Sequence, residues 1–295
     1  MIRSCPACGG RGSKKYSANI AEDKFSSTTY ASRKSPEFMH HSLAQCENCS
    51  SLFVEVLPNS SELSQKYVDA SFDSQVESEI AAKTYCRYLG KINLFRGKRV
   101  LDIGCGDGAF IKLALASGAD AVQGIEPSGG ALSSAGEMMG LIRADSIEVC
   151  DYDAEFDLVT CFQTLEHLVR PDETVLKMSQ AVVLGGYIAV VCHDRLSLLN
   201  RLLGRKSPIF DIEHLQMFTS NGLQKLFSNS GLNIVLAKQI INVYPIGYWL
   251  RLAPMPKTIK LFLEKKRGSG LLKFRVAIPV GNFLIVGQKL KDDLP

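Results

Sequence analysis

Two pairs of cysteines near the start of the chain have the spacing of metal ligands. Cys5 and Cys8 are separated by two residues, and so are Cys46 and Cys49. Four thiolates complete the tetrahedral shell of a structural Zn²⁺ ion, and paired C-x-x-C sequences are typical of such sites. The stretch between the pairs is longer than the usual gap of about fifteen to twenty residues. We therefore expect a zinc-knuckle module over residues 1–57 with a polar insertion.

A glycine-rich turn follows an apolar run at residues 99–103. Its sequence, Gly104-Cys105-Gly106-Asp107-Gly108, lets the backbone turn tightly and approach a ligand. The glycines alone also fit the loose pattern of dinucleotide sites. Asp102 and Asp107, however, place two carboxylates where a pyrophosphate would be repelled and a cationic ligand attracted. The stretch predicts a strand, a loop and a helix that together hold a positively charged nucleotide cofactor.

Further cofactor candidates share a place directly after a predicted strand. They are Glu126 and Pro127 after 121–125, Asp145 and Ser146 after 140–143, and Gln163 after 156–162. Ligands of α/β proteins gather outside the carboxyl ends of the strands, and an acidic residue there suits ribose hydroxyls. We expect Glu126 to bind the ribose.

Two Glu-His pairs are candidates for proton transfer. Glu166-His167 follows the strand at 156–162, and Glu213-His214 precedes a helix that Thr219 or Ser220 would cap. Histidine titrates near neutrality, and a carboxylate can orient it, so His214, His167 and Glu213 are the predicted catalytic residues. Purely structural roles for both histidines stay open. Glu166 with the two imidazoles is also a ligand set for a catalytic metal.

Alternating apolar runs and amphipathic stretches from residue 98 onward are typical of an α/β fold. Strands are predicted near 99–103, 121–125, 140–143, 156–162, 186–192, 233–240 and 283–290, and helices near 107–117, 128–139, 171–183 and 219–230. Residues 58–97 read as a helical linker that covers the cofactor. The main domain would span residues 98–295, with an insertion at 241–281 between its last two strands.

These motifs resemble those of the class I S-adenosylmethionine-dependent methyltransferases. The stretch 99–110 is similar to their first motif, and Leu165-Glu166-His167 to the signature after their fourth strand. The resemblance implies S-adenosyl-L-methionine as cofactor and a Rossmann-like sheet of seven strands, the last antiparallel, beside a small zinc-ribbon-like module. The cysteine knuckle and Glu213-His214 resemble zinc-knuckle sugar C-methyltransferases, which have Tyr where Asp211 stands here. Glycan, lipopolysaccharide and other small-molecule acceptors are therefore implied, with methylation at oxygen or carbon.

Charge is unevenly distributed along the chain. The net charge is +4, but residues 201–295 hold 15 Lys and Arg against 5 Asp and Glu. This excess favours an anionic or lipid-linked acceptor, or a simple solvated face. Aromatic residues beside Lys257, Lys260, Lys265, Lys266 and Arg267 in the insertion predict a membrane-surface segment or an acceptor lid, with an ordinary packed helix as the alternative.

The composition also bears on compartment and on competing functions. Nine cysteines without a disulfide-like framework, no secretory signal and no spanning apolar run indicate a cytoplasmic protein, at most peripheral to the inner membrane face. A nucleic-acid (RNA) methyltransferase is one alternative, because it would explain the basic C-terminal third and the knuckle, although no target-base motif of the Asn-Pro-Pro-Tyr type is present. A non-catalytic binding protein that retains the fold is the other alternative.

Overall fold

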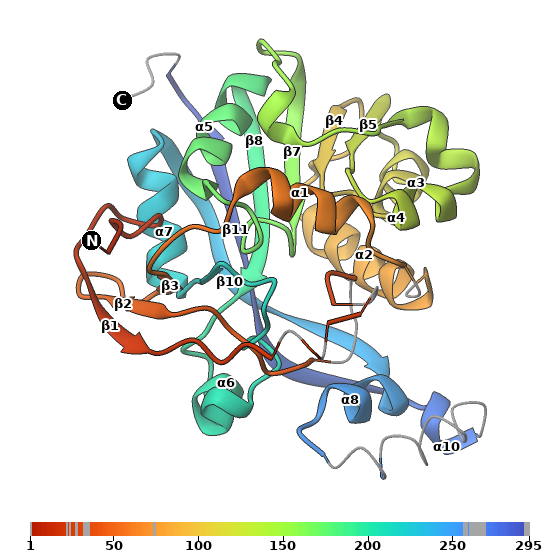
Figure 1. Cartoon of the computed structure of the whole chain (residues 1–295). Helices are drawn as coiled ribbons and strands as arrows, with labels where there is room; N and C mark the ends of the chain where they lie inside the picture. The colour runs from red at the N-terminus through yellow and green to blue at the C-terminus, as the bar shows by residue number, and fades with distance from the viewer. Residues whose placement is uncertain are drawn as a thin grey trace.

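The computed structural model describes residues 2–21, 23, 25–26, 29–31, 36–72, 75–255, 259 and 270–291. Its centre is a seven-stranded sheet of order β10-β11-β8-β7-β4-β5-β6 (Figure 1). The strands are β4 (Arg99–Ile103), β5 (Ala121–Ile125), β6 (Ile142–Arg143), β7 (Phe156–Phe162), β8 (Val182–His193), β10 (Leu232–Pro245) and β11 (Arg275–Lys289). All seven predicted strands are therefore confirmed.

Strand directions match the expected topology. Strands β4 to β8 pair in parallel, and β11 lies antiparallel between β8 and β10. From β4 the chain continues to β5 and β6 on one side of β4, and then crosses to β7 and β8 on the other side. Ligands of doubly wound sheets bind at such a switch point, outside the carboxyl ends of the strands. The sheet is that of a Rossmann-like α/β fold, as predicted.

Helices cover both faces of the sheet. One apolar cluster joins the sheet to α2 (Gln75–Gly90) and α3 (Ala109–Ala116), and another joins it to α5 (Pro171–Ala181) and α7 (Ser220–Asn229). Pro171 begins α5, and the Thr219 side chain accepts from the Gly222 N–H at 2.9 Å to cap α7. Of the two predicted capping residues, Thr219 is the one used.

The remaining helices are short. They are α1 (Ser60–Val68), α4 (Gly129–Ser134), α6 (Leu198–Leu203), α8 (Ile246–Leu252) and α10 (Gly270–Lys273). The predicted helix over 128–139 is wrong in its second half. Gly136 has φ of +53°, which ends the α-helical path, and the chain continues as a 3-10 helix over Gly136–Leu141.

The cysteine-bearing segment forms a second, smaller sheet. Strands β1 (Gly12–Tyr16), β2 (Leu43–Cys46) and β3 (Leu52–Val54) pair antiparallel, and β3 also pairs with β9 (Gln216–Met217). A strand from the main domain thus completes the N-terminal sheet. Figure 1 shows this sheet beside α7 and above α6.

The hairpin of β10 and β11 is longer than predicted. Val243 pairs with Ala277, and Pro245 pairs with Arg275, so both ends of the expected insertion at 241–281 belong to the hairpin. Helices α8 and α10 lie between the two strands, where the aromatic residues occur. The basic residues Lys257, Lys260, Lys265, Lys266 and Arg267 fall outside the described residues. The division into modules 1–57, 58–97 and 98–295 stays a prediction.

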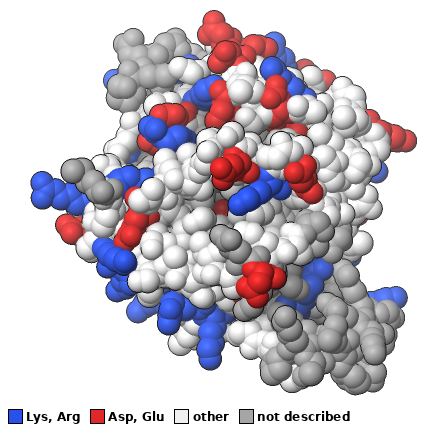
Figure 2. Space-filling view, in the orientation of Figure 1, with Lys and Arg blue, Asp and Glu red and all other residues white. Residues whose placement is uncertain are grey.

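Charged side chains are mixed over the face seen in Figure 2, with basic ones gathered along its lower left, over β1 and α6. In these elements and the turn after α6, the exposed cations are Lys14, Lys15, Arg201, Arg205 and Lys206. Two of these five, Lys14 and Lys15, belong to the N-terminal sheet and not to the basic C-terminal third of the sequence. Among the described helices, none has both the length and the apolarity to cross a bilayer.

Candidate functional site

A cavity of about 520 Å³ opens at the carboxyl ends of the central strands. One end of it is lined by the glycine loop and by the ends of β5 and β7. The other end is lined by His167, His193 and His214, by α6 and α8, and by the β10–β11 hairpin. We refer to these as the cofactor end and the acceptor end. A single cavity therefore spans the predicted cofactor residues and the predicted catalytic residues.

The glycine loop has a backbone that only glycine adopts easily. Gly104, Gly106 and Gly108 have φ of +68°, +58° and +76°. A Cβ on Gly104 would stand 2.3 Å from Thr164 Oγ1, whereas a Cβ on Gly106 would enter open space in the cavity. Gly108 is not in the cavity wall. It precedes α3 and packs on Met138, so it shapes the loop instead of facing a ligand.

Asp102 lies at the floor of the cofactor end. Its Oδ1 accepts a hydrogen bond from Thr160 Oγ1 at 2.7 Å, and its side chain is buried. Burial raises the pKa of Asp102 to about 7, with the nearby Glu126 adding to the effect. A cationic ligand would reverse this shift by stabilising the carboxylate.

Glu126 closes the glycine loop from the neighbouring strand. Its two oxygens accept from the N–H groups of Gly106 and Ser128, each at 2.9 Å. These bonds fix the carboxylate at the cavity wall, beside Pro127, and each oxygen retains a second lone pair. Burial raises the pKa of Glu126. The geometry fits a carboxylate that receives two ribose hydroxyls.

Asp145 and Ser146, predicted as neighbours at the adenine, have different surroundings. Ser146 lines the cavity with Ile147, but Asp145 is not in its wall. The Asp145 carboxylate instead pairs with Arg143 at 3.1 Å on the surface. The β6 strand is short and ends at Arg143, before Asp145. Of the two predicted residues, only Ser146 lines the cavity.

Gln163 sits at the end of β7 in a left-handed conformation, with φ of +54°. Its side chain lines the cavity, and its buried Nε2 has no hydrogen-bond partner among the described residues. Cys105, another predicted cofactor residue, lines the same end. A strained backbone and an unsatisfied donor facing the cofactor end fit a ligand-contacting residue.

His167 and His214 meet at the acceptor end, with ring centroids 4.8 Å apart. His214 Nδ1 donates to the Ile209 carbonyl at 2.7 Å, and His167 Nδ1 donates to the Glu213 carbonyl at 3.2 Å. A carbonyl can only accept, so in each neutral ring the proton is on Nδ1 and the lone pair on Nε2. The main-chain carbonyl of Glu213 is the acceptor for His167 Nδ1.

Glu166 is buried beside this histidine pair. The side chain is 3 % exposed; the Cys192 thiol and the His193 N–H stabilise its carboxylate, and no hydrogen bond of ordinary geometry reaches either oxygen from the described residues. Burial raises the pKa of Glu166 to about 7. Ligand atoms of Glu166, His167 and His214 all lie within 4.8 Å of one another.

Two asparagines of the hairpin are site residues that the sequence analysis missed. Asn242 on β10 and Asn282 on β11 line the acceptor end, and each has a buried Oδ1 without a partner among the described residues. Tyr248 and Trp249 of α8 also face this cavity, and Trp249 Nε1 donates to the Val276 carbonyl at 3.0 Å. No local motif marks these residues, because hairpin pairing brings them to the site. His193, missed as well, ends β8, where the strand-end rule applies.

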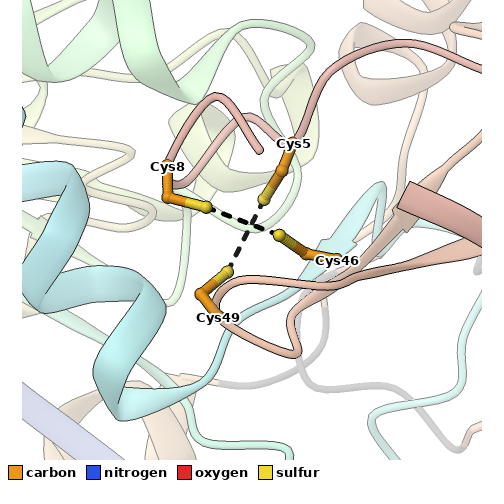
Figure 3. A group of neighbouring side chains, drawn as sticks. All are labelled: Cys5, Cys8, Cys46 and Cys49. Carbon is orange, nitrogen blue, oxygen red and sulfur yellow. Dashed lines mark hydrogen bonds between the residues drawn. The ribbon is translucent and has the colours of Figure 1, made fainter. Parts of the chain in front are cut away.

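The four cysteines of the N-terminal module converge on one point (Figure 3). Their Sγ atoms all lie within 4.8 Å of one another, at 3.7 Å for Cys5 and Cys49 and 3.4 Å for Cys8 and Cys46. None is in a disulfide. A tetrahedral Zn²⁺ with Zn–S bonds of about 2.3 Å requires sulfur separations of roughly 3.8 Å. The donor set fits zinc.

The cysteine cluster is tied to the acceptor end through the main chain. Thr219 Oγ1 donates to the Cys49 carbonyl at 2.7 Å, and the β3–β9 pairing places Gln216 opposite Phe53. Gln216 Nε2 then donates to the carbonyls of Leu165, Glu166 and Leu168 at 2.7–3.1 Å. The knuckle therefore supports the loop that carries Glu166 and His167.

Comparisons with known proteins agree with this geometry. A family model described as a methyltransferase domain matches residues 72–237. An O-methyltransferase of ubiquinone biosynthesis from Aromatoleum aromaticum is 40% identical over 100 residues, covering 31% of this chain and 42% of the relative. Its mitochondrial counterpart from Schizosaccharomyces pombe is 31% identical over 120 residues, covering 38% of this chain and 43% of the relative. The match thus spans less than half the length of these curated relatives.

Solved structures share the fold at low sequence identity. A putative methyltransferase from Bacillus halodurans has a TM-score of 0.52 at 16% identity, over 70% of this chain and 98% of its own. A Thermotoga maritima S-adenosylmethionine-dependent methyltransferase has a TM-score of 0.50 at 18% identity, over 72% and 92% of the two chains. With the sheet order, the glycine loop and the matched family model, the chain belongs to the methyltransferase-domain family and has the fold of its class I, S-adenosylmethionine-dependent members.

Proposed function

We propose that this enzyme transfers a methyl group from S-adenosyl-L-methionine to a hydroxyl oxygen of a small-molecule acceptor. The observation that carries the proposal is the single cavity, with buried carboxylates at one end and paired imidazoles at the other. The O-methyltransferase names of the relatives in ubiquinone biosynthesis support an oxygen acceptor.

The cofactor residues have separate roles in this proposal. Asp102 neutralises the cationic methionine part, and Glu126 receives the ribose hydroxyls. Gly104, Cys105, Gly106 and Pro127 shape the wall, Ser146 meets the base, and Gln163 contacts the methionine part near the sulfonium. Gly108 and Asp145, which do not line the cavity, hold the loop and the surface outside it.

The chemistry at the acceptor end is an in-line displacement. An acceptor oxygen forms a bond to the methyl carbon while the bond from that carbon to sulfur breaks, and a neutral thioether leaves. Holding the two reactants in contact supplies much of the rate acceleration. His214 or His167 takes the hydroxyl proton at Nε2, which is unprotonated in the neutral ring. Glu213 positions His167 through its main-chain carbonyl.

The acceptor end favours an acceptor that combines apolar surface with hydrogen-bond donors. Leu199 and Leu203 of α6, together with Tyr248 and Trp249 of α8, supply an apolar wall. The unsatisfied oxygens of Asn242 and Asn282 suit hydroxyl donors on the acceptor. In this proposal α8 is a wall of the acceptor site, which favours the lid over the membrane-surface role for 241–281.

Other expectations concern the acceptor class, the membrane, the compartment and the metal. A glycan or lipid-linked acceptor, a membrane surface and a cytoplasmic location stay predictions. So does Zn²⁺ at the cysteine cluster, which the sulfur geometry supports.

Calorimetric titration with S-adenosyl-L-methionine tests the first half of the proposal. Incubation with a methyl-labelled cofactor and panels of hydroxylated aromatics and sugars, read by mass spectrometry, tests the second. We expect cofactor binding and a methyl label on oxygen. Absence of cofactor binding would refute the methyltransferase. If the protein binds the cofactor but transfers no methyl group, even in cell extract, the non-catalytic binding protein is favoured. If it transfers methyl groups to nucleic acid only, the nucleic-acid methyltransferase is favoured.

A further inference from the structure

Glu166, His167 and His214 form a second group of metal-ligand type, apart from the cysteine cluster. Their ligand atoms lie within 4.8 Å of one another at the acceptor end of the cavity. Two imidazoles and one carboxylate are a frequent ligand set for divalent first-row transition metals. The three residues come from two segments that are distant in the sequence, so the fold itself assembles the group.

The imidazoles are oriented as metal ligands usually are. Histidines that bind a metal through one ring nitrogen commonly donate the other N–H to a carbonyl or carboxylate. Here Nδ1 of His214 donates to the Ile209 carbonyl, and Nδ1 of His167 donates to the Glu213 carbonyl. Both rings are thereby fixed with Nε2 as the nitrogen whose lone pair binds the metal ion.

The carboxylate is the group that most needs a cation. Both oxygens of Glu166 are buried, and the Cys192 thiol and the His193 N–H are the groups that stabilise the carboxylate; no cationic side chain among the described residues pairs with it. Burying a carboxylate is unfavourable unless its charge is compensated. A bound divalent ion would satisfy both oxygens.

The ligands are also held together before any ion binds. The Leu215 N–H donates to the Glu166 carbonyl at 3.0 Å, which ties the segment of His214 to that of Glu166 and His167. Gln216 Nε2 donates to the same carbonyl at 3.1 Å. Fixed backbone segments reduce the ordering that metal binding would otherwise require.

We propose that Glu166, His167 and His214 bind a divalent transition-metal ion that holds the acceptor hydroxyl. Three protein ligands leave coordination positions open for an acceptor oxygen. A bound metal lowers the pKa of a coordinated hydroxyl, whose proton then leaves to solvent, and the resulting oxygen anion attacks the methyl carbon. This inference rests on the proposed function and refines it: the two imidazoles act through the ion instead of as the base.

Cobalt distinguishes the two sites of the full-length protein. Co²⁺ bound by thiolates shows sulfur-to-metal charge-transfer absorption, whereas Co²⁺ bound by nitrogen and oxygen does not. After removal of bound metal, titration with Co²⁺ should show two ions per chain, only one of them with charge-transfer absorption. We expect His214→Gln and Glu166→Gln to weaken the second ion at least about tenfold and to leave the first unchanged. His41→Gln, in the N-terminal module, is the matched control and should keep both.

Cofactor titration on each variant shows whether it is folded, because Glu166 and His214 lie away from the cofactor residues. The inference is wrong if the wild-type protein binds Co²⁺ only with charge-transfer absorption. It is also wrong if folded His214→Gln and Glu166→Gln proteins retain the second ion at full affinity. Metal binding without methyl transfer would refute the proposed function and leave the metal site standing, and methyl transfer without this metal would do the reverse.

Discussion

The two ends of the cavity are built in different ways. The cofactor end uses segments that each lie within a few residues of a strand end, around Asp102, Glu126 and Gln163. The acceptor end gathers residues from α6, from the Glu213-His214 loop and from both strands of the hairpin. Its loops also depend on the N-terminal sheet through Gln216. The comparison teaches that donor binding is a local property of this chain, whereas acceptor binding is a property of its tertiary structure.

We expect the largest difference between the two ends when the predicted zinc ion is lost, because stability should fall while cofactor affinity is kept. Cys46→Ser removes one of four thiolates, and we expect the protein to lose tightly bound zinc and about 3 kcal/mol or more of unfolding free energy. Affinity for S-adenosyl-L-methionine should change less than about threefold while the domain is folded, because no cofactor residue belongs to the module. Metal analysis, urea unfolding and calorimetry measure these effects. Cys86→Ser, outside the cluster, is the control, and a parallel loss of cofactor affinity would contradict the separation.

Asp102→Asn should affect the cofactor end. The substitution keeps the shape and removes the buried charge that faces a cationic ligand, so cofactor binding should weaken by about 1.5–3 kcal/mol, roughly 10- to 100-fold. Calorimetry measures the change, and the surface variant Asp120→Asn should bind normally. Unchanged affinity in Asp102→Asn would mean that this carboxylate does not meet the cofactor.

The same carboxyl predicts a pH dependence. Burial raises the pKa of Asp102 to about 7, so the group is protonated below that pH and binds a cation poorly. Cofactor affinity should rise with pH up to about 7 and then level off. Stability from this group should run the other way, because the folded state retains the proton that the unfolded state loses between about pH 4 and 7. Both trends should flatten in Asp102→Asn, and calorimetry with urea unfolding across this range measures them.

Gln216→Leu should disturb the acceptor end although Gln216 does not itself line the cavity. It removes the amide that donates to the carbonyls of Leu165, Glu166 and Leu168; the Glu166 carbonyl keeps the Leu215 N–H, but those of Leu165 and Leu168 lose this donor, at a cost of about 1–3 kcal/mol. Urea unfolding measures this loss, and cofactor affinity should stay within about twofold. The half-buried variant Gln224→Leu on α7, whose amide donates only within its own helix to the Ser220 carbonyl, provides the comparison; equal stability of the two variants would refute the supporting role.

Asp145→Ala should have the smallest effect. Asp145 pairs with Arg143 on the surface, where side-chain exposures of 36% and 44% screen the interaction. Such pairs contribute about 0.2–1 kcal/mol. We expect little change in unfolding free energy and none in cofactor affinity by calorimetry, whereas Ser146→Trp should obstruct the cofactor end. Strong loss of binding in Asp145→Ala would restore the adenine role predicted for it.

Sequence reasoning predicted the seven strands well because each strand shows a local pattern. The strand at 99–103 and the glycine loop are visible in a dozen residues, and the four cysteines in two short motifs. Asn242 and Asn282 carry no such signal, since a hairpin with irregular register brings them to one wall. The role predicted for the Glu213 carboxylate, to orient a histidine, stays a prediction; the main-chain carbonyl of Glu213 also contacts His167, and side-chain chemistry does not indicate that contact.

The pairing of β3 with β9 has a consequence for biosynthesis. Leu52 pairs with Met217, and Arg3 Nη2 donates to Gln216 Oε1 at 3.1 Å, so the N-terminal sheet finds its last strand more than half a chain later. A ribosome releases the chain from its N-terminus at about 5–20 residues per second. The four cysteines are therefore made before β9 and can bind metal early. The edge of β3 that pairs with β9 stays unpaired until residue 217 has been made. That edge can close only after residue 217 has been made, whereas β10 and β11, which complete the main sheet, are made later still.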